Sequence, residues 1–254
     1  MQQGASATRR TVEKKPAKPR AGTRASKSEE GERPTRANGR ATRQAMREAA
    51  VDLFYEHGYK NVSLRFLASE VGVQAGSLYN HISTKQNLLF VLLQEIMEDV
   101  LISTKRELEG SHSVLEELQR FVQAHLDFHT SRLKEVYIGN SELRNLEPEN
   151  RKIIVGLRKK YFDIIHDIIQ RGSDQRLFVV PNTQVVARVV MGMLNGVAGW
   201  YRADGESSVA DITRIYLAMI FRALGAPVAA IEGMPQAEPT AAQPKQRKKS
   251  AGSR

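Results

Sequence analysis

Helical periodicity is the feature that most constrains the fold of this 254-residue chain. From about residue 46 to residue 224, apolar side chains recur three and four positions apart, as they do along one face of an α-helix. The first such face is carried by Met46, Ala49, Ala50, Leu53 and Phe54. Glycines and prolines interrupt the pattern, and no stretch reads well as a strand ladder. We therefore predict an all-α fold.

These interruptions divide the chain into a series of predicted helices. The helices cover about residues 46–57, 64–71, 74–81, 83–108, 114–131, 134–145, 148–172, 182–203 and 209–224. Gly58 is available for a left-handed C-cap after the first helix, and Ser63 can N-cap the second. Ser83 and Gln86 have the spacing of a capping box, which predicts the start of the long fourth helix.

The positive charge of the chain lies in its two ends. Residues 1–43 hold 12 Lys/Arg and 4 Asp/Glu, residues 226–254 hold 5 and 2, and the segment between them is close to neutral. Both ends are too poor in apolar residues to offset the entropy of ordering. We therefore predict disordered basic tails at 1–38 and 226–254. Their charge favours contact with polyanions but reads no sequence, and it can equally serve solubility alone.

Several classes of protein are disfavoured by what the sequence lacks. There is no cysteine, no apolar run of the kind found in secretory signals, and no uninterrupted apolar stretch long enough for a membrane span, so we expect a cytoplasmic protein without membrane contact. No phosphate-binding loop, dinucleotide fingerprint or nucleophile elbow is present, so we expect no enzyme, no catalytic residue and no cofactor. His125 and His129 are four residues apart, but no third ligand stands out, so we predict no metal site.

The most specific local motif lies near the N-terminus. Two short predicted helices, 64–71 and 74–81, flank the tight turn at 71–73 and are followed by a capped helix, which is the pattern of a helix-turn-helix. In this motif the second helix enters the DNA major groove, so its outward positions must be small or polar. Leu78 and Ile82 can face inward, as can Ala75. The outward positions are Gln74, Gly76, Ser77, Asn80 and His81.

The side chains of this segment suit DNA contacts. Gln74 and Asn80 can bond bidentately to adenine. Lys85 begins a helix, where its charge and the free N–H groups can together hold a phosphate, and Arg40 and Arg43 can reach phosphate or a minor groove. Phosphate contacts are also open to Ser77, Tyr79 and His81. The predicted DNA-binding residues are Arg40, Arg43, Ser63, Arg65, Gln74, Ala75, Gly76, Ser77, Tyr79, Asn80, His81 and Lys85.

These runs resemble one known family. MREAAVDLFYEHGY (46–59), VSLRFLASEVGV (62–73), GSLYNHI (76–82) and the segment from Lys85 to Leu89 are similar to the DNA-binding domain of the tetracycline-repressor (TetR) family. Ile82 stands where the family usually has Phe, and Phe66 where a polar residue is common. The resemblance implies a three-helix DNA-binding domain at 39–86 and a helical ligand-binding and dimerisation domain at 87–225. Members usually repress transcription and release DNA when a ligand enters the second domain.

The resemblance also implies a homodimer that binds a pseudo-palindromic operator. Family members dimerise through their last two helices, here about 182–203 and 209–224. The residues suit that role, because both segments are rich in apolar side chains, although a helix in the core of a monomer would have the same composition. The apolar positions are Val186, Val189, Val190, Met193, Leu194 and Val197 on the first and Ile212, Ile215, Met219, Ile220 and Leu224 on the second.

The small-molecule effector is suggested by a looser similarity. The runs 144–153, 158–161, 194–201 and 204–205 resemble a TetR subgroup that responds to acyl-CoA thioesters, which implies a repressor of fatty-acid or other acyl-CoA metabolism. Such a ligand needs an apolar tunnel and cations for its phosphates. The candidate ligand-binding residues are Phe121, Phe128, Arg158, Phe162, Met193 and Trp200. The same aromatics can be ordinary core residues, and the cations on this helix a solvated face.

Two alternatives remain open at this point. The effector can instead be a hydrophobic drug-like molecule, with an efflux or stress operon under control. The chain can also be an architectural protein whose basic tails bind DNA without sequence preference, with a steep salt dependence.

Overall fold

The computed structural model describes residues 36–74, 76, 78 and 82–226, and within them it contains helices and connecting segments but no strand. The all-α prediction is therefore confirmed. The helices are α1 (Arg36–His57), α2 (Leu64–Val71), α4 (Lys85–Leu108), α5 (Val114–Ser131), α6 (Leu133–Glu142), α7 (Pro148–Asp174), α8 (Thr183–Asn195), α9 (Val197–Trp200) and α10 (Val209–Ala223). Two 3-10 turns cover Tyr59–Asn61 and Leu143–Asn145.

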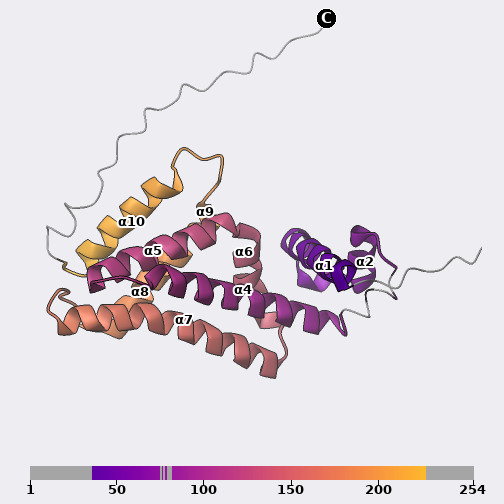
Figure 1. The fold of residues 1–254 in the computed structure, drawn as a ribbon, viewed down its shortest axis with the longest axis horizontal. Helices are drawn as coiled ribbons and strands as arrows, with labels where there is room; N and C mark the ends of the chain where they lie inside the picture. Colours follow the sequence, from indigo (N-terminus) through magenta and orange to yellow (C-terminus); the bar gives the residue numbers. More distant parts are fainter. Residues whose placement is uncertain (1–35, 75, 77, 79–81, 227–254) are drawn as a thin grey trace, which may run out of the picture.

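The helices form a small head and a larger bundle (Figure 1). α1 and α2 pack together at one end of the molecule, and α4 runs from beside this head into the bundle, where it contacts α5 and α7. α8 packs on α7, and α10 packs on α5. The short α6 contacts both α1 and α4, so it lies at the junction between the head and the bundle.

The head is held together by one apolar core. Met46, Ala50 and Phe54, four residues apart on α1, are all fully buried, as the periodicity predicted. Ser63 caps α2 as predicted, because its Oγ accepts a hydrogen bond from the backbone N–H of Phe66 at 3.1 Å. Leu78, whose side chain is fully buried, belongs to the same core.

Three predicted helix boundaries differ from the structure. α1 begins at Arg36, inside the segment assigned to the N-terminal tail. Gly58 does not form a left-handed cap: its φ is 75° but its ψ is 148°, because the chain turns directly into the 3-10 turn of the buried Tyr59. The helix predicted over 182–203 is two helices, separated at Gly196 and ending at Trp200.

The predicted capping box is also wrong. Thr84, not Ser83, caps α4, with its Oγ1 accepting from the backbone N–H of Asn87 at 3.0 Å. Gln86 does not fold back onto the cap. Its amide donates to the carbonyl oxygen of Asn145 at 2.6 Å and accepts from the backbone N–H of Glu147 at 3.3 Å. The side chain thus ties the first turn of α4 to the segment that leads into α7.

The last turn of α7 packs on the buried ring of Phe178. A Cβ added to Gly172 would lie 2.1 Å from this ring, while the backbone N–H groups of Leu177 and Phe178 both donate to the Gly172 carbonyl. Since ring and backbone are fixed together, there is no room for a side chain at this position.

We expect Gly172→Ala to lower the free energy of unfolding by about 1–3 kcal/mol, as overpacking of a core does. Gly156 is the matched control, because it lies exposed inside the same helix with nothing within 4 Å of an added Cβ. Gly156→Ala should raise the free energy of unfolding by roughly 0.5–1 kcal/mol. Urea unfolding of the two variants measures both effects, and equal changes would contradict the packing described here.

Candidate functional site

The head presents part of the predicted DNA-binding surface. Arg43, Arg65, Gln74 and Gly76 are exposed, as is the capping residue Ser63. Arg40 lies in α1, but its side chain is outside the described part of the structure. The same is true of Ala75, Ser77, Tyr79, Asn80 and His81 as whole residues. The predicted residues that the structure describes are thus accessible to a ligand, and the DNA interface itself stays a prediction.

Lys85 is engaged within the protein. Its ammonium lies 4.2 Å from the centre of the Tyr59 ring and donates to the carbonyl oxygen of Lys60 at 3.2 Å. Burial lowers the pKa of Lys85, while the charge of Glu142 opposes this change. The lysine thus joins the start of α4 to the 3-10 turn after α1. Lys85 is also the residue that was predicted to contact a phosphate.

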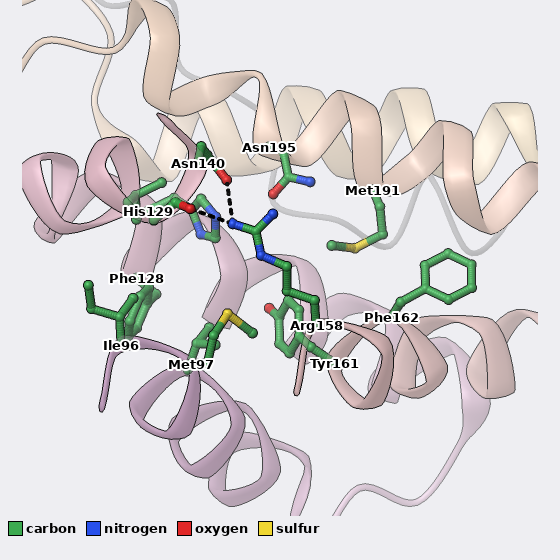
Figure 2. Close-up of a pocket in the computed structure, with 13 residues that line it drawn as sticks. Ile96, Met97, Phe128, His129, Asn140, Arg158, Tyr161, Phe162, Met191 and Asn195 are labelled. Atoms are coloured by element: carbon green, nitrogen blue, oxygen red, sulfur yellow. Dashed lines mark hydrogen bonds between the residues drawn. The ribbon is translucent and has the colours of Figure 1, made fainter. Parts of the chain in front are cut away.

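The bundle encloses a cavity of about 220 Å³ between α4, α5, α6, α7 and α8 (Figure 2). Its wall is mostly apolar, with polar groups gathered around Arg158. The lining residues are Ile96, Met97, Val100, Phe128, His129, Val136, Gly139, Asn140, Arg158, Tyr161, Phe162, Met191 and Asn195. Asn140 and Asn195 are exposed, so the polar side of the cavity faces its opening.

Only half of the predicted ligand-binding residues line this cavity. Phe128, Arg158 and Phe162 do. Phe121 lies behind the wall, fully buried and stacked on Tyr161 with ring centres 5.4 Å apart. Met193 and Trp200 are also absent from the lining.

The geometry of α8 explains why those two residues miss the cavity. Met191 and Asn195, four positions apart, share the face that lines it. Met193, halfway between them, points elsewhere. Trp200 lies beyond the break at Gly196 and is 53% exposed. Most of the lining residues that were not predicted are apolar and match ordinary core positions. The polar ones among them are His129, Asn140, Tyr161 and Asn195.

Arg158 is the cation of the cavity. Its Nη2 donates to the carbonyl oxygen of Gly139 at 2.6 Å and to Oδ1 of Asn140 at 3.4 Å (Figure 2). Removal from water lowers the pKa of the guanidinium. No carboxylate of the described residues forms an ion pair with it, whereas the neighbouring Lys159 pairs with Asp163.

Two stacked imidazoles lie beside the cavity. The rings of His125 and His129 are 3.7 Å apart, Nδ1 of His125 lies 3.0 Å from the Tyr161 hydroxyl, and Nδ1 of His129 donates to the carbonyl oxygen of His125 at 2.9 Å. Burial lowers the pKa of His129 to about 4 and the pKa of His125 well below its usual value. Both rings are therefore neutral near pH 7. Within the described residues, no cluster of three or more metal-ligating side chains occurs.

The neutral state of His129 predicts a pH-dependent stability. The unfolded chain takes up a proton near pH 6.5 that the folded chain takes up only near pH 4. The free energy of unfolding therefore falls as the pH drops through this window, by about 2 kcal/mol from pH 7 to pH 5 for this residue alone. Urea unfolding across the window should show a shallower pH slope for His129→Gln and an unchanged slope for the exposed control His112→Gln. Equal slopes in all three proteins would refute the assignment.

α6 connects the cavity with the DNA-binding head. Val136, Gly139 and Asn140 of this helix line the cavity. Glu135 on the same helix accepts from Nη1 of Arg47 in α1 at 2.9 Å, and Nε of Arg47 also donates to Glu95 of α4 at 3.0 Å. Two further contacts join the helices: Lys134 with Asp52 at 2.5 Å, and the rings of Tyr55 and Tyr137 edge to face at 5.1 Å. A displacement of α6 therefore acts on α1 directly.

α8 and α10 expose apolar side chains to solvent. Val185 and Val189 on α8 are 55% and 58% exposed, and Ile215 and Met219 on α10 are 54% and 48% exposed. In each pair the residues are four positions apart, so each helix presents an apolar stripe. We call these four residues the outer apolar face.

The described residues form a small helical head in contact with a helical domain that contains a cavity. The sequence profile described as "Bacterial regulatory proteins, tetR family" matches residues 47–92, and the profile "Tetracyclin repressor-like, C-terminal domain" matches residues 111–224. The chain belongs to the tetracycline-repressor family of transcriptional regulators.

Individual relatives support this assignment. The chain is 30% identical over 112 residues to the HTH-type transcriptional regulator SAR2658 of Staphylococcus aureus, a match that covers 43% of this chain and 60% of that protein. It is similar in structure to PfmR of Thermus thermophilus, with a TM-score of 0.65, 28% identity and coverage of 70% and 97% of the two chains. It is also similar to AibR solved with isovaleryl coenzyme A and operator DNA, with a TM-score of 0.66, 25% identity and coverage of 71% and 98%.

None of the described helices is long and apolar enough to span a bilayer.

Proposed function

We propose that this protein is a homodimeric, sequence-specific transcriptional repressor that leaves its operator when a small molecule enters the cavity. The observation that carries the proposal is α6, which lines the cavity on one side and holds α1 of the DNA-binding head on the other. Since a ligand shifts an equilibrium only by its differential affinity for two states, this shared helix supplies the required connection. The protein acts in the cytoplasm and catalyses no reaction.

Dimerisation is supported by the outer apolar face. Four large apolar side chains exposed on α8 and α10 would be covered in a dimer that pairs these two helices of both subunits. Two heads related by a twofold axis would read two half-sites of a pseudo-palindromic operator, with centres about 34–36 Å apart or somewhat more.

An acyl-CoA thioester is the effector we propose, with genes of acyl-CoA metabolism under control. The neighbour AibR was solved with a short acyl-CoA, and the apolar wall of the cavity suits an acyl chain. The acyl chain would lie against the apolar wall, with the coenzyme at the opening beside Asn140 and Asn195.

Selection of bound duplexes from a random DNA pool tests the DNA-binding half of the proposal. We expect an inverted repeat. Gln74→Ala should relax the preference at one base pair of each half-site, with a loss of about 1–3 kcal/mol in discrimination. Gln44→Ala is the control, because Gln44 is exposed on α1 and its amide donates to Glu48 of the same helix. Recovery of random sequence would instead favour an architectural protein bound through its basic ends.

A further inference from the structure

We infer that the effector carries an anionic oxygen group, a carboxylate or a phosphate, which pairs with Arg158 across the polar side of the cavity. The inference rests on the proposed effector site and defines the chemistry of its ligand. Figure 2 shows the guanidinium of Arg158 between the side chains of Asn140 and Asn195, at the end of the cavity opposite the apolar side chains of Ile96 and Phe128.

The unused donors of Arg158 are the first observation. Both of its hydrogen bonds come from Nη2, so Nε and Nη1 donate to no other described residue. The guanidinium has five N–H donors in a planar fork, and one edge of this fork remains free. A free edge of that geometry matches the two oxygens of a carboxylate or phosphate.

The missing counter-charge is the second observation. Arg47, Arg132, Arg171 and Arg214 in the described part of the chain each lie within hydrogen-bonding distance of a carboxylate. Arg158 is partly buried and has only neutral carbonyl partners, and its desolvation is not offset by a negative charge. A partly buried cation without a counter-ion is costly for the folded protein, and an anionic ligand removes that cost on binding.

A purely structural role explains only part of this arrangement. The carbonyl of Gly139 lies in the last turn of α6, where helix carbonyls lack partners within the helix, and one N–H of Arg158 satisfies it. A cation at a helix C-terminus is also favourable. Neither role requires that the free donors of the guanidinium, Nε and Nη1, lie at the cavity.

The size and wall of the cavity define the rest of the ligand. The cavity, with a volume of about 220 Å³, has room for a short apolar chain. The apolar lining can pack against such a chain, and it offers few hydrogen bonds to a polar ligand. The inferred ligand is therefore an amphiphile with an apolar body of this size and one anionic end.

Calorimetric titration of the full chain without DNA tests the inference. The probes are octanoate, octanoyl-CoA and the neutral octan-1-ol. We expect at least one anionic probe to bind about tenfold to hundredfold more tightly than the alcohol, as a charge-assisted hydrogen bond predicts. Binding of octanoate alone would identify the anionic group as a free carboxylate. Binding of octanoyl-CoA alone would identify it as a phosphate of the coenzyme. Binding of neither, or equal binding of the alcohol, would overturn the inference.

Variants locate the anionic group. Arg158→Gln should remove the advantage of the anionic probe and leave the alcohol unaffected. Arg158→Lys keeps the positive charge without the planar guanidinium and should retain part of the preference for the anionic probe. This variant tests the inference even if Arg158→Gln does not fold. Lys160→Gln removes the same charge from an exposed position of α7 and should change nothing. An unchanged anion preference in a folded Arg158 variant would overturn the inference, while specific DNA binding would leave the regulator assignment intact.

Discussion

We expect the replacement of Val189 and Met219 by glutamate to convert the proposed dimer to a monomer and to weaken operator binding by about a hundredfold or more. Both side chains belong to the outer apolar face, and both are about half exposed in the single chain, so the substitutions leave the core of each subunit intact. In the dimer they would bury four carboxylates, which is costly without partners. A monomer also loses the effective concentration of the second head, a factor of about 10² to 10⁴ in affinity.

A matched control separates this effect from general damage. Ile153 and Val155 on α7 are each 48% exposed and lie outside the outer apolar face. Their double replacement by glutamate should leave both the mass in sedimentation equilibrium and the operator affinity unchanged. A Val189/Met219 variant that stays dimeric with full operator affinity would show that the subunits meet elsewhere.

We expect the variant Arg47→Met to bind the operator but not to release it on addition of the effector. Arg47 of α1 donates to carboxylates of both α4 and α6. Its loss leaves Glu135, whose side chain is only 14% exposed, with a longer contact of 3.4 Å to Arg132. We expect the free energy of unfolding to fall by about 1–3 kcal/mol. In allosteric proteins an effector typically changes the affinity for the second ligand about 5-fold to 150-fold. For Arg47→Met, the ratio of the operator affinities without and with effector should approach one.

Lys159→Met is the control for this variant, because it breaks an ion pair of similar kind with Asp163 on the exposed side of α7. Exposed pairs of this type contribute little to stability. Fluorescence anisotropy of labelled operator, with and without effector, compares the two variants. Full release from the operator by Arg47→Met would show that the signal passes from the cavity to the head by another route.

The sequence predicted the helices better than it predicted their ends. Periodicity depends on burial, so it located Met46, Ala50 and Phe54 correctly. The end of a helix depends on single hydrogen bonds. Thr84 caps α4 where Ser83 was predicted, and Gln86 is bound to Asn145, far away in the sequence. The break at Gly196 was missed as well, because apolar residues recur on both sides of it.

The cavity was harder to predict than the fold. Ile96, Val100 and Val136 line it, yet they have the spacing and chemistry of core residues, because a small cavity and a filled core use the same side chains. Arg158 and Lys159 are neighbours in the sequence, and only the structure shows that one faces the cavity and the other solvent. Tertiary position, which a single sequence does not carry, separates a ligand contact from a surface charge.

Fluorescence anisotropy of the wild-type protein on its selected operator, titrated with octanoyl-CoA or octanoate, tests the central claim most directly. The account predicts tight binding to the operator, weak binding to a scrambled duplex, and release of the operator at the concentrations where the same probe binds the free protein, with no release by free coenzyme A. Equal affinity for both duplexes, or an operator affinity unchanged at a saturating concentration of a bound probe, would contradict the claim that the cavity controls sequence-specific DNA binding.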